Sequence, residues 1–180
     1  EIKGHQVYID FEKSLIEQGY FIWSKVVFCP DYGIAQGRKR LVLLASKFSE
    51  ISLISPTHQK PNYVTVRNVI SKLKPIAAGD KNLSDPIHKS NRLTEINRKR
   101  IKASKQGGTW HDWSEDIRLE CHKRATGKGY VSVYGRMKWD EPSPTITTQA
   151  YNYGSGRFGH PEQDRAITLR EAALLQSFPE

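Results

Sequence analysis

The chain has 180 residues, and 28 Lys and Arg against 19 Asp and Glu give it a formal net charge of +9 and an isoelectric point near 9.6. Its 37% of hydrophobic residues can form the core of one domain or two small ones, and the excess of positive charge favours a polyanionic partner, usually nucleic acid, over a basic enzyme without one. No apolar run reaches 18 residues, which excludes a membrane-spanning helix, and two cysteines cannot build a disulfide framework, which favours a reducing, cytoplasmic location.

The first 46 residues predict a helix, a strand, a loop and a second strand. Residues 6–18 place apolar side chains at helical spacing, and Gly19 follows as a stop signal. Residues 20–28 are aromatic and β-branched, as in a strand, and the apolar run Leu41–Ala45 predicts a strand buried on both faces of a parallel or mixed sheet. Two strands cannot bury their own apolar faces, so we expect the edge of a larger α/β sheet.

The loop between these strands, Asp31–Arg40, carries an amide and two permanent cations onto the start of the second strand. Arg38 and Arg40 are two residues apart, so on a strand both side chains leave from the same face. Together with Gln36 they could grip an anion or a planar polar ring. A basic turn at a sheet edge is the simpler explanation of the same residues.

From about residue 48 the pattern changes to helices and loops. Residues 64–73 predict a helix with Thr65 as its N-cap, and residues 75–91 are rich in Pro, Gly, Asp, Asn and Ser, as in a surface loop. Residues 93–104 predict a second helix, and Gly107-Gly108 ends it. We expect its apolar residues to point inward, namely Leu93, Ile96 and Ile101.

Positive charge concentrates in the segment 65–105, where eleven Lys and Arg face three acidic residues and leave a net charge of +8. On the second helix no acidic residue interrupts the basic run, which could be a solvated face. The absence of pairing acids makes phosphate contact the better interpretation. We therefore expect four residues to contact the nucleic-acid backbone: Arg98, Lys99, Arg100 and Lys102.

The following stretch, to about residue 141, predicts short strands and turns around an aromatic core that contains Trp110, Trp113, Tyr130, Tyr134 and Trp139. Residues 142–151 form a β-type run, and residues 152–160 form a polar loop with three glycines. Such a loop can approach a base edge closely, although it could equally be a plain surface loop. Cys121, His122 and His111 show no metal-binding spacing and are interpreted as structural.

The chain closes on a predicted helix with Thr168 and Glu171 as its capping box. An apolar stripe of Ala172, Leu175 and Phe178 follows, and Pro179 ends the helix.

The loop and the closing helix together resemble two ordered motifs of the DNA cytosine-5 methyltransferases. In that family D-Y-G-V-P-Q-x-R-x-R before an apolar strand is the eighth of ten motifs, and R-x-L-T-x-R-E-x-x-x-L-Q-x-F-P is the ninth. Asp31–Arg40 is similar to the eighth and Arg165–Pro179 to the ninth, with Ala35 in place of a proline and Ser177 in place of a frequent glycine. About 120 residues separate them, which suits the target-recognition region that lies between these motifs in the family.

The resemblance covers essentially the whole chain and implies its organisation. Residues 1–48 would be the C-terminal edge of a Rossmann-like, S-adenosylmethionine-dependent methyltransferase sheet. Residues 49–163 would be a small, mixed, loop-rich target-recognition domain that binds double-stranded DNA, and residues 164–180 would be the ninth-motif helix that links back to the catalytic domain. The fold class is therefore expected to be α/β.

The resemblance also implies roles for individual residues. Arg40 would contact O2 of a cytosine swung out of the duplex, while Arg38 and Gln36 would support the loop and the flipped nucleotide. Base edges would be read by recognition loops that contain Arg136, Thr147, Thr148, Gln149, Tyr151, Asn152 and Arg157. Arg165, Thr168 and Glu171 would orient the recognition region rather than touch DNA.

Other family segments are not found in the sequence: the Pro-Cys nucleophile loop, the Glu-Asn-Val segment, the glycine-rich loop for S-adenosylmethionine and the tenth motif. Cys29-Pro30 lies at the end of the strand that leads into the eighth motif, so it is interpreted as a core or strand-end cysteine rather than the nucleophile. We expect the chain to be the C-terminal portion of a restriction-modification methyltransferase, with the nucleophile and the cofactor site upstream of residue 1. Alone it should neither transfer methyl groups nor bind the cofactor.

Three alternatives remain open at this stage. The chain could be the specificity subunit of a two-polypeptide methyltransferase, a non-catalytic DNA-binding module, or an RNA-binding protein that stacks single strands on its aromatic residues. The last ranks lowest because no known RNA-binding motif is present. An exposed sheet edge would also allow a homodimer.

Overall fold

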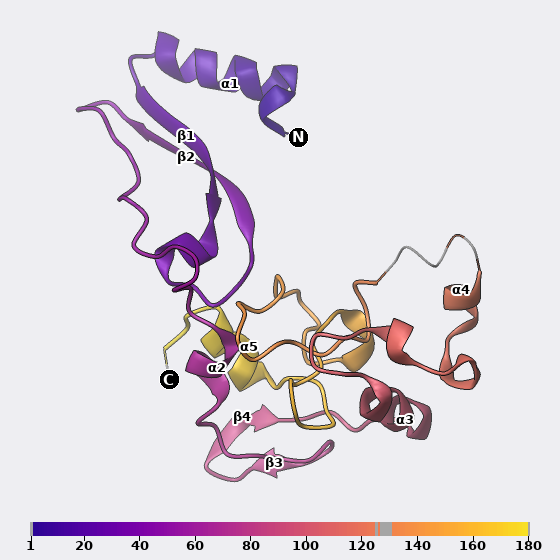
Figure 1. Ribbon diagram of the computed structural model, residues 1–180. Coiled ribbons are helices and arrows are strands. Elements are labelled where there is room, and N and C mark those ends of the chain that lie inside the picture. The colour runs from indigo at the N-terminus through magenta and orange to yellow at the C-terminus, as the bar shows by residue number, and fades with distance from the viewer. Residues whose placement is uncertain (1, 125, 127–130, 180) are drawn as a thin grey trace.

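The computed structural model describes residues 2–124, 126 and 131–179, and it has a mixed α/β architecture in two parts (Figure 1). An arm contains the 3₁₀ helix η1 (Ile2–Gly4), α1 (Gln6–Glu17), β1 (Phe21–Phe28) and β2 (Lys39–Ser46). A body contains the short helices, a small hairpin and long loops from residue 64 onward. None of the described helices has the length and apolar character needed to cross a membrane.

The arm is built on an antiparallel pair of strands. Phe21 of β1 lies opposite Ser46 of β2, and Phe28 lies opposite Lys39. The connection passes through the 3₁₀ helix η2 (Cys29–Tyr32) and turns at Gly33, whose φ of +79° favours glycine. No residue of β2 is buried, so the prediction of a strand buried on both faces is wrong for the described residues, where β1 is the only strand that pairs with it.

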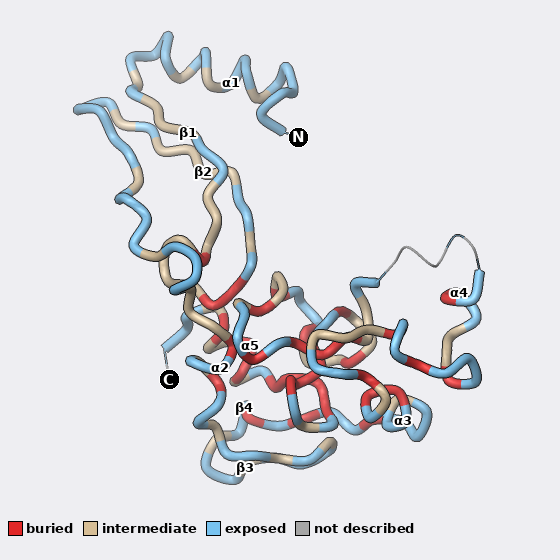
Figure 2. The backbone as a smooth tube through the Cα atoms, in the orientation of Figure 1, coloured by how far each residue is buried: buried red, intermediate tan, exposed pale blue. Residues whose placement is uncertain are grey.

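The helix of the arm confirms the predicted helical spacing, but its apolar residues are not buried. α1 covers the predicted residues and is followed by Gly19 with a φ of +81°, yet it contains no buried residue. Val7 is 82% exposed, and Phe11 and Ile16 are also exposed. Figure 2 shows the contrast between this largely exposed arm and the body, where the buried segments concentrate. The apolar face of α1 is therefore uncovered by the described residues.

The body contains two helices with the predicted N-terminal caps. α2 (Val66–Ile70) begins with a capping box between Thr65 and Asn68 and is shorter than predicted. α5 (Leu169–Leu175) begins with the predicted capping box between Thr168 and Glu171. The two helices pack against each other, and their buried residues share one core cluster: Val66, Ile70, Ala172 and Leu175.

The C-terminal end of α5 departs from the predicted stripe. The backbone N–H groups of Ser177 and Phe178 donate to the carbonyl oxygens of Leu174 and Ala173, as in a Schellman motif. Ser177 has a φ of +63°, the left-handed conformation that favours glycine at this position. The chain turns away here, so Phe178 is 62% exposed and does not continue the buried face.

Residues 81–89, within the segment predicted as a surface loop, form a hairpin, so that prediction is wrong for these residues. β3 (Lys81–Asn82) pairs antiparallel with β4 (Asp85–Lys89), and the Asn82 side chain accepts a hydrogen bond from the backbone of Ser84 in the turn. β4 packs against α5, and Asp85 pairs with Arg170 at 2.6 Å between carboxylate and guanidinium. Such tertiary contacts stabilise strands whose local sequence favours turns.

The basic helix is α3 (Glu95–Ala103), and its N-cap is Thr94. Leu93 and Ile101 are buried as predicted, but Ile96 is 38% exposed, which corrects its assignment to the inner face. Ile96 precedes Ile101 by five residues, and that spacing places the two side chains on different faces of a helix.

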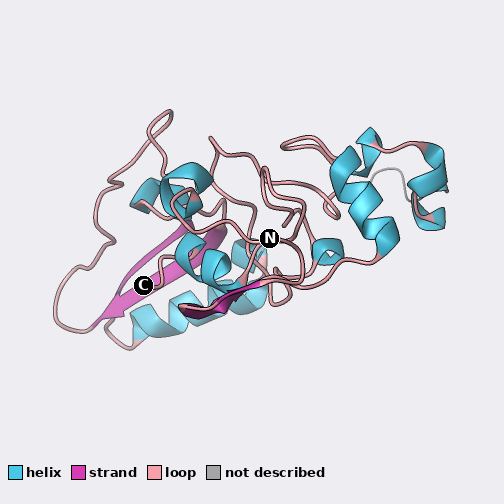
Figure 3. Cartoon of the chain, turned by 90° about the horizontal axis from the view of Figure 1, so that it is seen from below, coloured by secondary structure: helices cyan, strands magenta, loops and turns pink. Residues whose placement is uncertain are grey.

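The aromatic stretch contains helical turns, so the short strands predicted there are wrong for its described residues. The helical turns are η3 (Trp110–Asp112), η4 (Glu115–Ile117) and α4 (Glu120–Lys123). A further one, η6 (Tyr153–Ser155), follows later in the chain. Residues 142–151 form no continuous strand: Ser143 makes an isolated parallel bridge to Gln36, and residues 147–150 form a turn. Figure 3 shows how much of the body is loop.

Two clusters of buried residues hold the body together. One contains Met137, Trp139, Ile146 and Phe158 beside the α2–α5 pair. The other lies under α3 and includes the predicted Trp110 and Trp113, while Tyr134 packs at its margin and Tyr130 is outside the described residues. Figure 1 shows that long loops make up much of the body that contains these clusters.

Candidate nucleic-acid interface

The loop at residues 31–40, which carries the predicted base-contacting residues, is held by hydrogen bonds to residues 57–63. The Asp31 carbonyl oxygen accepts hydrogen bonds from the backbone N–H groups of Thr57 and His58, at 2.9 and 3.0 Å. The Tyr63 hydroxyl donates to the Asp31 carboxylate at 2.7 Å, and this hydrogen bond raises the pKa of Tyr63. The segment at residues 57–63 therefore holds the first half of the loop.

Gln36 joins this loop to the recognition segment. Its side chain is 3% exposed, and its Oε1 accepts a hydrogen bond from the backbone N–H of Ile146 at 3.1 Å. Gly37 N–H donates to the Ser143 carbonyl at 2.8 Å, and Ser143 N–H donates to the Ala35 carbonyl at 2.9 Å. The Thr145 hydroxyl donates to the Gly37 carbonyl at 3.1 Å. Residues 35–37 and 143–146 thus form one hydrogen-bonded joint.

Beyond the joint, Arg38 and Arg40 lie at the surface. Arg38 is half-buried, and Arg40, the second residue of β2, is exposed. The Arg40 guanidinium donates to the Lys39 carbonyl at 2.6 Å. Within the described part of the chain neither guanidinium forms an ion pair with a carboxylate. Their charge is therefore uncompensated by local acidic groups.

The recognition residues downstream of the joint gather on one surface loop system. Thr147, Thr148, Gln149 and Arg157 are exposed, and Tyr151 and Asn152 are half-buried. A turn in which the Ala150 N–H donates to the Thr147 carbonyl begins the loop. Asn152 is held by the Asn91 side chain, which donates to its Oδ1 at 2.7 Å.

The basic helix presents three of its four predicted cations to solvent. Arg98, Lys99 and Lys102 are exposed. Arg100 is only 7% exposed, and its Nε donates to the Ile117 carbonyl at 2.8 Å while its guanidinium lies over the rings of Trp113 and Tyr134. Arg100 packs η4 against α3, a position that does not suit the phosphate contact expected for it.

Arg136 is likewise buried, at 6% exposure. Its guanidinium donates to the carbonyl oxygens of Ile101, Ser104, His160 and Gln163, and it pairs with the Asp164 carboxylate. A side chain with this set of partners ties α3 to the loop at residues 160–164. It is not placed to read a base edge, as the sequence had led us to expect.

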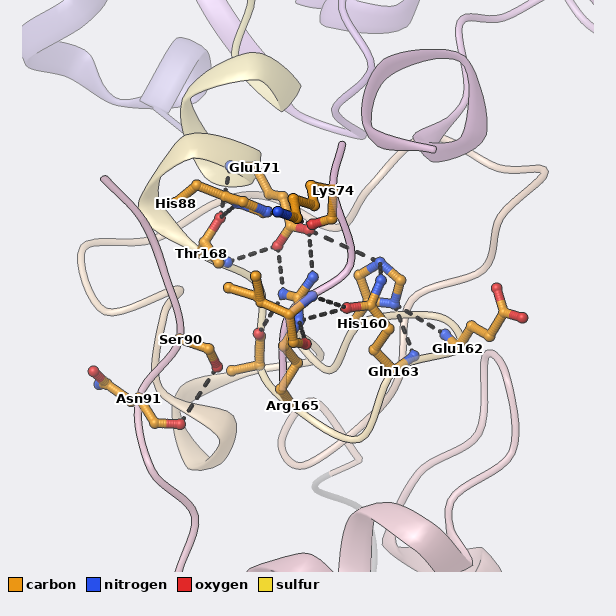
Figure 4. Close-up of polar contacts among 12 residues, drawn as sticks. Lys74, His88, Ser90, Asn91, His160, Glu162, Gln163, Arg165, Thr168 and Glu171 are labelled. Carbon is orange, nitrogen blue, oxygen red and sulfur yellow. Dashed lines mark hydrogen bonds and ion pairs between the residues drawn. The ribbon is translucent and has the colours of Figure 1, made fainter. Parts of the chain in front are cut away.

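Arg165 and Glu171 form a buried ion pair (Figure 4). Both are 1% exposed, and the two guanidinium nitrogens donate to the two carboxylate oxygens at 2.7 Å each. Burial alone would raise the pKa of Glu171, but the hydrogen bonds and charge of Arg165 outweigh it, so that pKa is lowered. Arg165 Nε also donates to the Ile76 carbonyl at 3.1 Å, which anchors the start of the hairpin segment.

Two buried histidines complete this network, and sequence reasoning missed both. His88 Nδ1 lies 3.0 Å from the Thr168 hydroxyl and its Nε2 lies 2.9 Å from the Lys74 carbonyl. His160 Nδ1 accepts the backbone N–H groups of Glu162 and Gln163, and Figure 4 shows it beside Arg165. Isolated histidines in polar loops carry no periodic signal that would mark them as buried.

His160 should make the fold sensitive to acid. Burial lowers its pKa to about 4 from an ordinary value of 6.5, so unfolding takes up a proton between these values. Stability that is fully present above pH 6.5 is therefore lost as the pH falls through 4, by roughly 3 kcal/mol in total. Denaturant unfolding at several pH values checks this. His160→Gln should flatten the dependence between pH 6.5 and 5, and an unchanged slope would contradict the assignment.

The remaining candidates take structural positions. Cys29 is half-buried at the start of η2, and Cys121 is exposed on α4. Trp110 stacks between His111 and His122, with ring centroids 4.0 and 4.4 Å away. Among the described residues no group of three or more His, Cys, Asp or Glu could hold a metal ion.

Comparison with known proteins identifies the family. Residues 3–180 match the family of C-5 cytosine-specific DNA methylases. The chain is 55% identical over 174 residues to the type II methylase M.HgiDII of Herpetosiphon aurantiacus, and this match covers 97% of the chain and 49% of the relative. It is 31% identical to the type II methyltransferase M1.BsuMI of Bacillus subtilis, with 95% and 39% covered. The chain thus spans about half the length, or less, of these relatives.

A solved structure supports the fold. The crystal structure of a DNA modification methyltransferase encoded within an E. coli prophage matches with a TM-score of 0.63 and 19% identity, over 98% of this chain and 56% of that one. With the family match over nearly the whole chain, the eighth- and ninth-motif segments have a common explanation. The chain belongs to the C-5 cytosine-specific DNA methylase family.

Proposed function

We propose that this chain is the C-terminal, DNA-recognising portion of a type II DNA cytosine-5 methyltransferase of a restriction-modification system. The observation that carries the proposal is the joint between residues 35–37 and 143–146. On one side it leads to the exposed Arg40, with which none of the described carboxylates pairs, and on the other to the exposed side chains of Thr147–Gln149. One rigid element thereby places a base-holding cation and a base-reading loop at a fixed separation.

In the proposed reaction the target cytosine leaves the duplex and lies against the loop at residues 31–40. Arg40 donates to the cytosine O2 and stabilises the negative charge that builds on the ring during methyl transfer. Gln36 acts through the joint, because its side chain is buried and bonded to Ile146. Arg38, half-buried beside it, supports the loop and the phosphates of the flipped nucleotide.

The methyl group would come from S-adenosylmethionine bound by the rest of the enzyme. Cofactors of this kind bind at the glycine-rich turn between a parallel strand and a helix. The described residues do not form such a unit, because β1 continues through η2 into the antiparallel β2. We therefore assign neither the cofactor nor the nucleophile to this chain.

DNA contacts divide between phosphates and bases. Arg98, Lys99 and Lys102 are exposed on α3 and would hold phosphates of the duplex. Thr147, Thr148, Gln149, Tyr151, Asn152 and Arg157 would face base edges. Because Arg100 and Arg136 are buried, we do not assign them DNA contacts. Like Arg165, Thr168 and Glu171, they would instead stabilise the fold that supports the DNA-binding surface.

The test is complementation of the 180-residue chain. Alone, it should transfer no labelled methyl group from S-adenosylmethionine to duplex DNA. Mixed or co-expressed with the catalytic half of a related methyltransferase, it should restore transfer at specific cytosines. Transfer by the chain alone would refute the proposed division of roles, and salt-sensitive duplex binding without any complementation would favour a non-catalytic DNA-binding module. Complementation by a separately encoded natural chain would identify a specificity subunit.

A further inference from the structure

A polar hollow lies at the joint between the loop and the recognition segment. It has a volume of about 360 Å³, and its lining includes Gly37 from the loop, residues 142–145, and Lys138, Glu141 and Arg157. The joint forms one wall, since Gly37 and Ser143 are hydrogen-bonded at 2.8 Å. The hollow is therefore next to the point where Arg38 and Arg40 emerge.

The charge of this hollow is positive. Lys138 and Arg157 are exposed at its surface, whereas the guanidinium of Arg136, which also lines it, is already paired with Asp164. Glu141 is the only acidic residue among those that line it. The Lys138 ammonium pairs with the Glu141 carboxylate at 2.6 Å, and both side chains are at least half exposed, so the pair is weak and open to competition.

Two glycines make room for the cationic side chains. A Cβ at Gly107 would lie 2.6 Å from Cε of Lys138, and a Cβ at Gly135 would lie 2.8 Å from Cγ of Arg157. The aliphatic parts of the Lys138 and Arg157 side chains thus lie directly against the backbone of Gly107 and Gly135. This contact restricts the positions of the two charged groups. Gly107 has a φ of +73°, so a side chain there would also strain the turn.

The chemistry of the lining suits a phosphate better than a base. Apart from Arg157, which the proposed function places toward base edges, and the paired Arg136, the remaining lining residues are Gly, Pro, Ser, Thr and Met, so the hollow offers neither an aromatic ring to stack a base nor an Asn or Gln amide to read one. A lysine ammonium is a point charge that pairs with phosphate oxygens from any direction. A phosphodiester is thus the DNA group that the hollow can bind.

We propose that the hollow seats one backbone phosphate of the bound DNA, that Lys138 is its main cation, and that Glu141 competes with this phosphate for Lys138. The inference rests on the proposed function as a DNA methyltransferase. The joint fixes the hollow relative to Arg40, so a phosphate seated there sets the position of the strand from which the cytosine leaves. Lys138 acts as a positioning residue rather than a catalytic one.

The experiment measures duplex binding by the whole methyltransferase that contains this chain, over a range of salt concentrations. Lys138→Gln should weaken binding about 3–10-fold and reduce the slope of log affinity against log salt by about one. Glu141→Gln should act in the opposite direction and strengthen binding about 2–3-fold, because the carboxylate no longer competes. The matched control pair is Lys13 and Glu17 on α1, an exposed lysine–glutamate pair in the arm. Lys13→Gln and Glu17→Gln make the same charge changes there and should leave binding nearly unchanged.

Neutral methylphosphonate linkages, placed one at a time around the target cytosine, identify the phosphate. At one position the neutral linkage should weaken the unmodified enzyme as much as Lys138→Gln does, and should not weaken the Lys138→Gln variant further. If no position shows this non-additivity, or if Glu141→Gln weakens binding like Lys138→Gln, the seat is refuted. An enzyme that still binds and methylates duplex DNA in those cases leaves the proposed function intact, whereas an unmodified enzyme that does neither refutes both.

Discussion

Replacing Arg40 with alanine in the whole methyltransferase is expected to slow methyl transfer about 10²–10³-fold and to change duplex binding only a few-fold. Arg40 is exposed at the start of β2, and none of the described carboxylates pairs with it. Its charge is therefore available to the reacting ring, and the stabilisation is greatest when negative charge has built up there. Single-turnover transfer rates and equilibrium binding, measured on the same duplex, separate the two effects.

The control for this experiment is the neighbouring Lys39. Successive side chains of a strand point to opposite faces. Lys39→Ala therefore removes a positive charge from the position next to Arg40 but on the opposite face of β2. It should leave the transfer rate close to that of the unmodified enzyme. Equal losses of rate and binding in Arg40→Ala would instead make Arg40 a phosphate anchor.

Replacing Glu171 with glutamine should reduce the free energy of unfolding by about 3–5 kcal/mol. Glu171 is 1% exposed and makes two hydrogen bonds to Arg165, which is equally buried. The substitution leaves the Arg165 guanidinium without a compensating charge in a site closed to water. It also weakens the cap of α5, because Glu171 accepts the Thr168 N–H at 2.7 Å. Urea unfolding followed by tryptophan fluorescence measures the loss.

A second ion pair in the body provides the comparison. Arg67 and Asp140 also form two hydrogen bonds, at 2.6 and 2.9 Å, but their side chains are 50% and 72% exposed. Asp140→Asn should therefore cost much less than Glu171→Gln. The double replacement of Arg165 by Met and Glu171 by Leu should cost less than Glu171→Gln alone, since it leaves no unpaired buried charge. Similar losses in Glu171→Gln and Asp140→Asn would show that burial of the first pair contributes nothing.

Local signals in the sequence predicted the N-terminal ends of two helices well, but not their C-terminal ends. Thr65 and Thr168 are caps whose hydrogen bonds reach only three residues along the chain, so the sequence alone contains both partners. The eighth- and ninth-motif segments are similarly compact. Their pairing in order was enough to identify the family before any contact between them was visible.

Other features depend on partners distant in the chain and could not be predicted. Arg100 and Arg136 look like their exposed neighbours in sequence, and only the carbonyl groups that surround them in the fold make them structural. Residues 81–89 carry turn-like composition, yet packing against α5 stabilises them as a hairpin. The hydrophobic run of β2 predicted burial, but the described residues cover only part of that strand.

The joint and the α2–α5 pair have a consequence for how such a protein can change. The chain leaves the arm and returns to α5 at neighbouring places, because α2 and α5 pack side by side and residues 35–37 bond to residues 143–146 (Figure 1). The residues between these contacts form one long segment whose two ends lie beside the same elements. A loop closed in this way tolerates changes in length at little cost in stability. The surface proposed to read DNA can therefore be exchanged by replacing one continuous stretch of gene, while the residues proposed to hold the flipped base stay as they are.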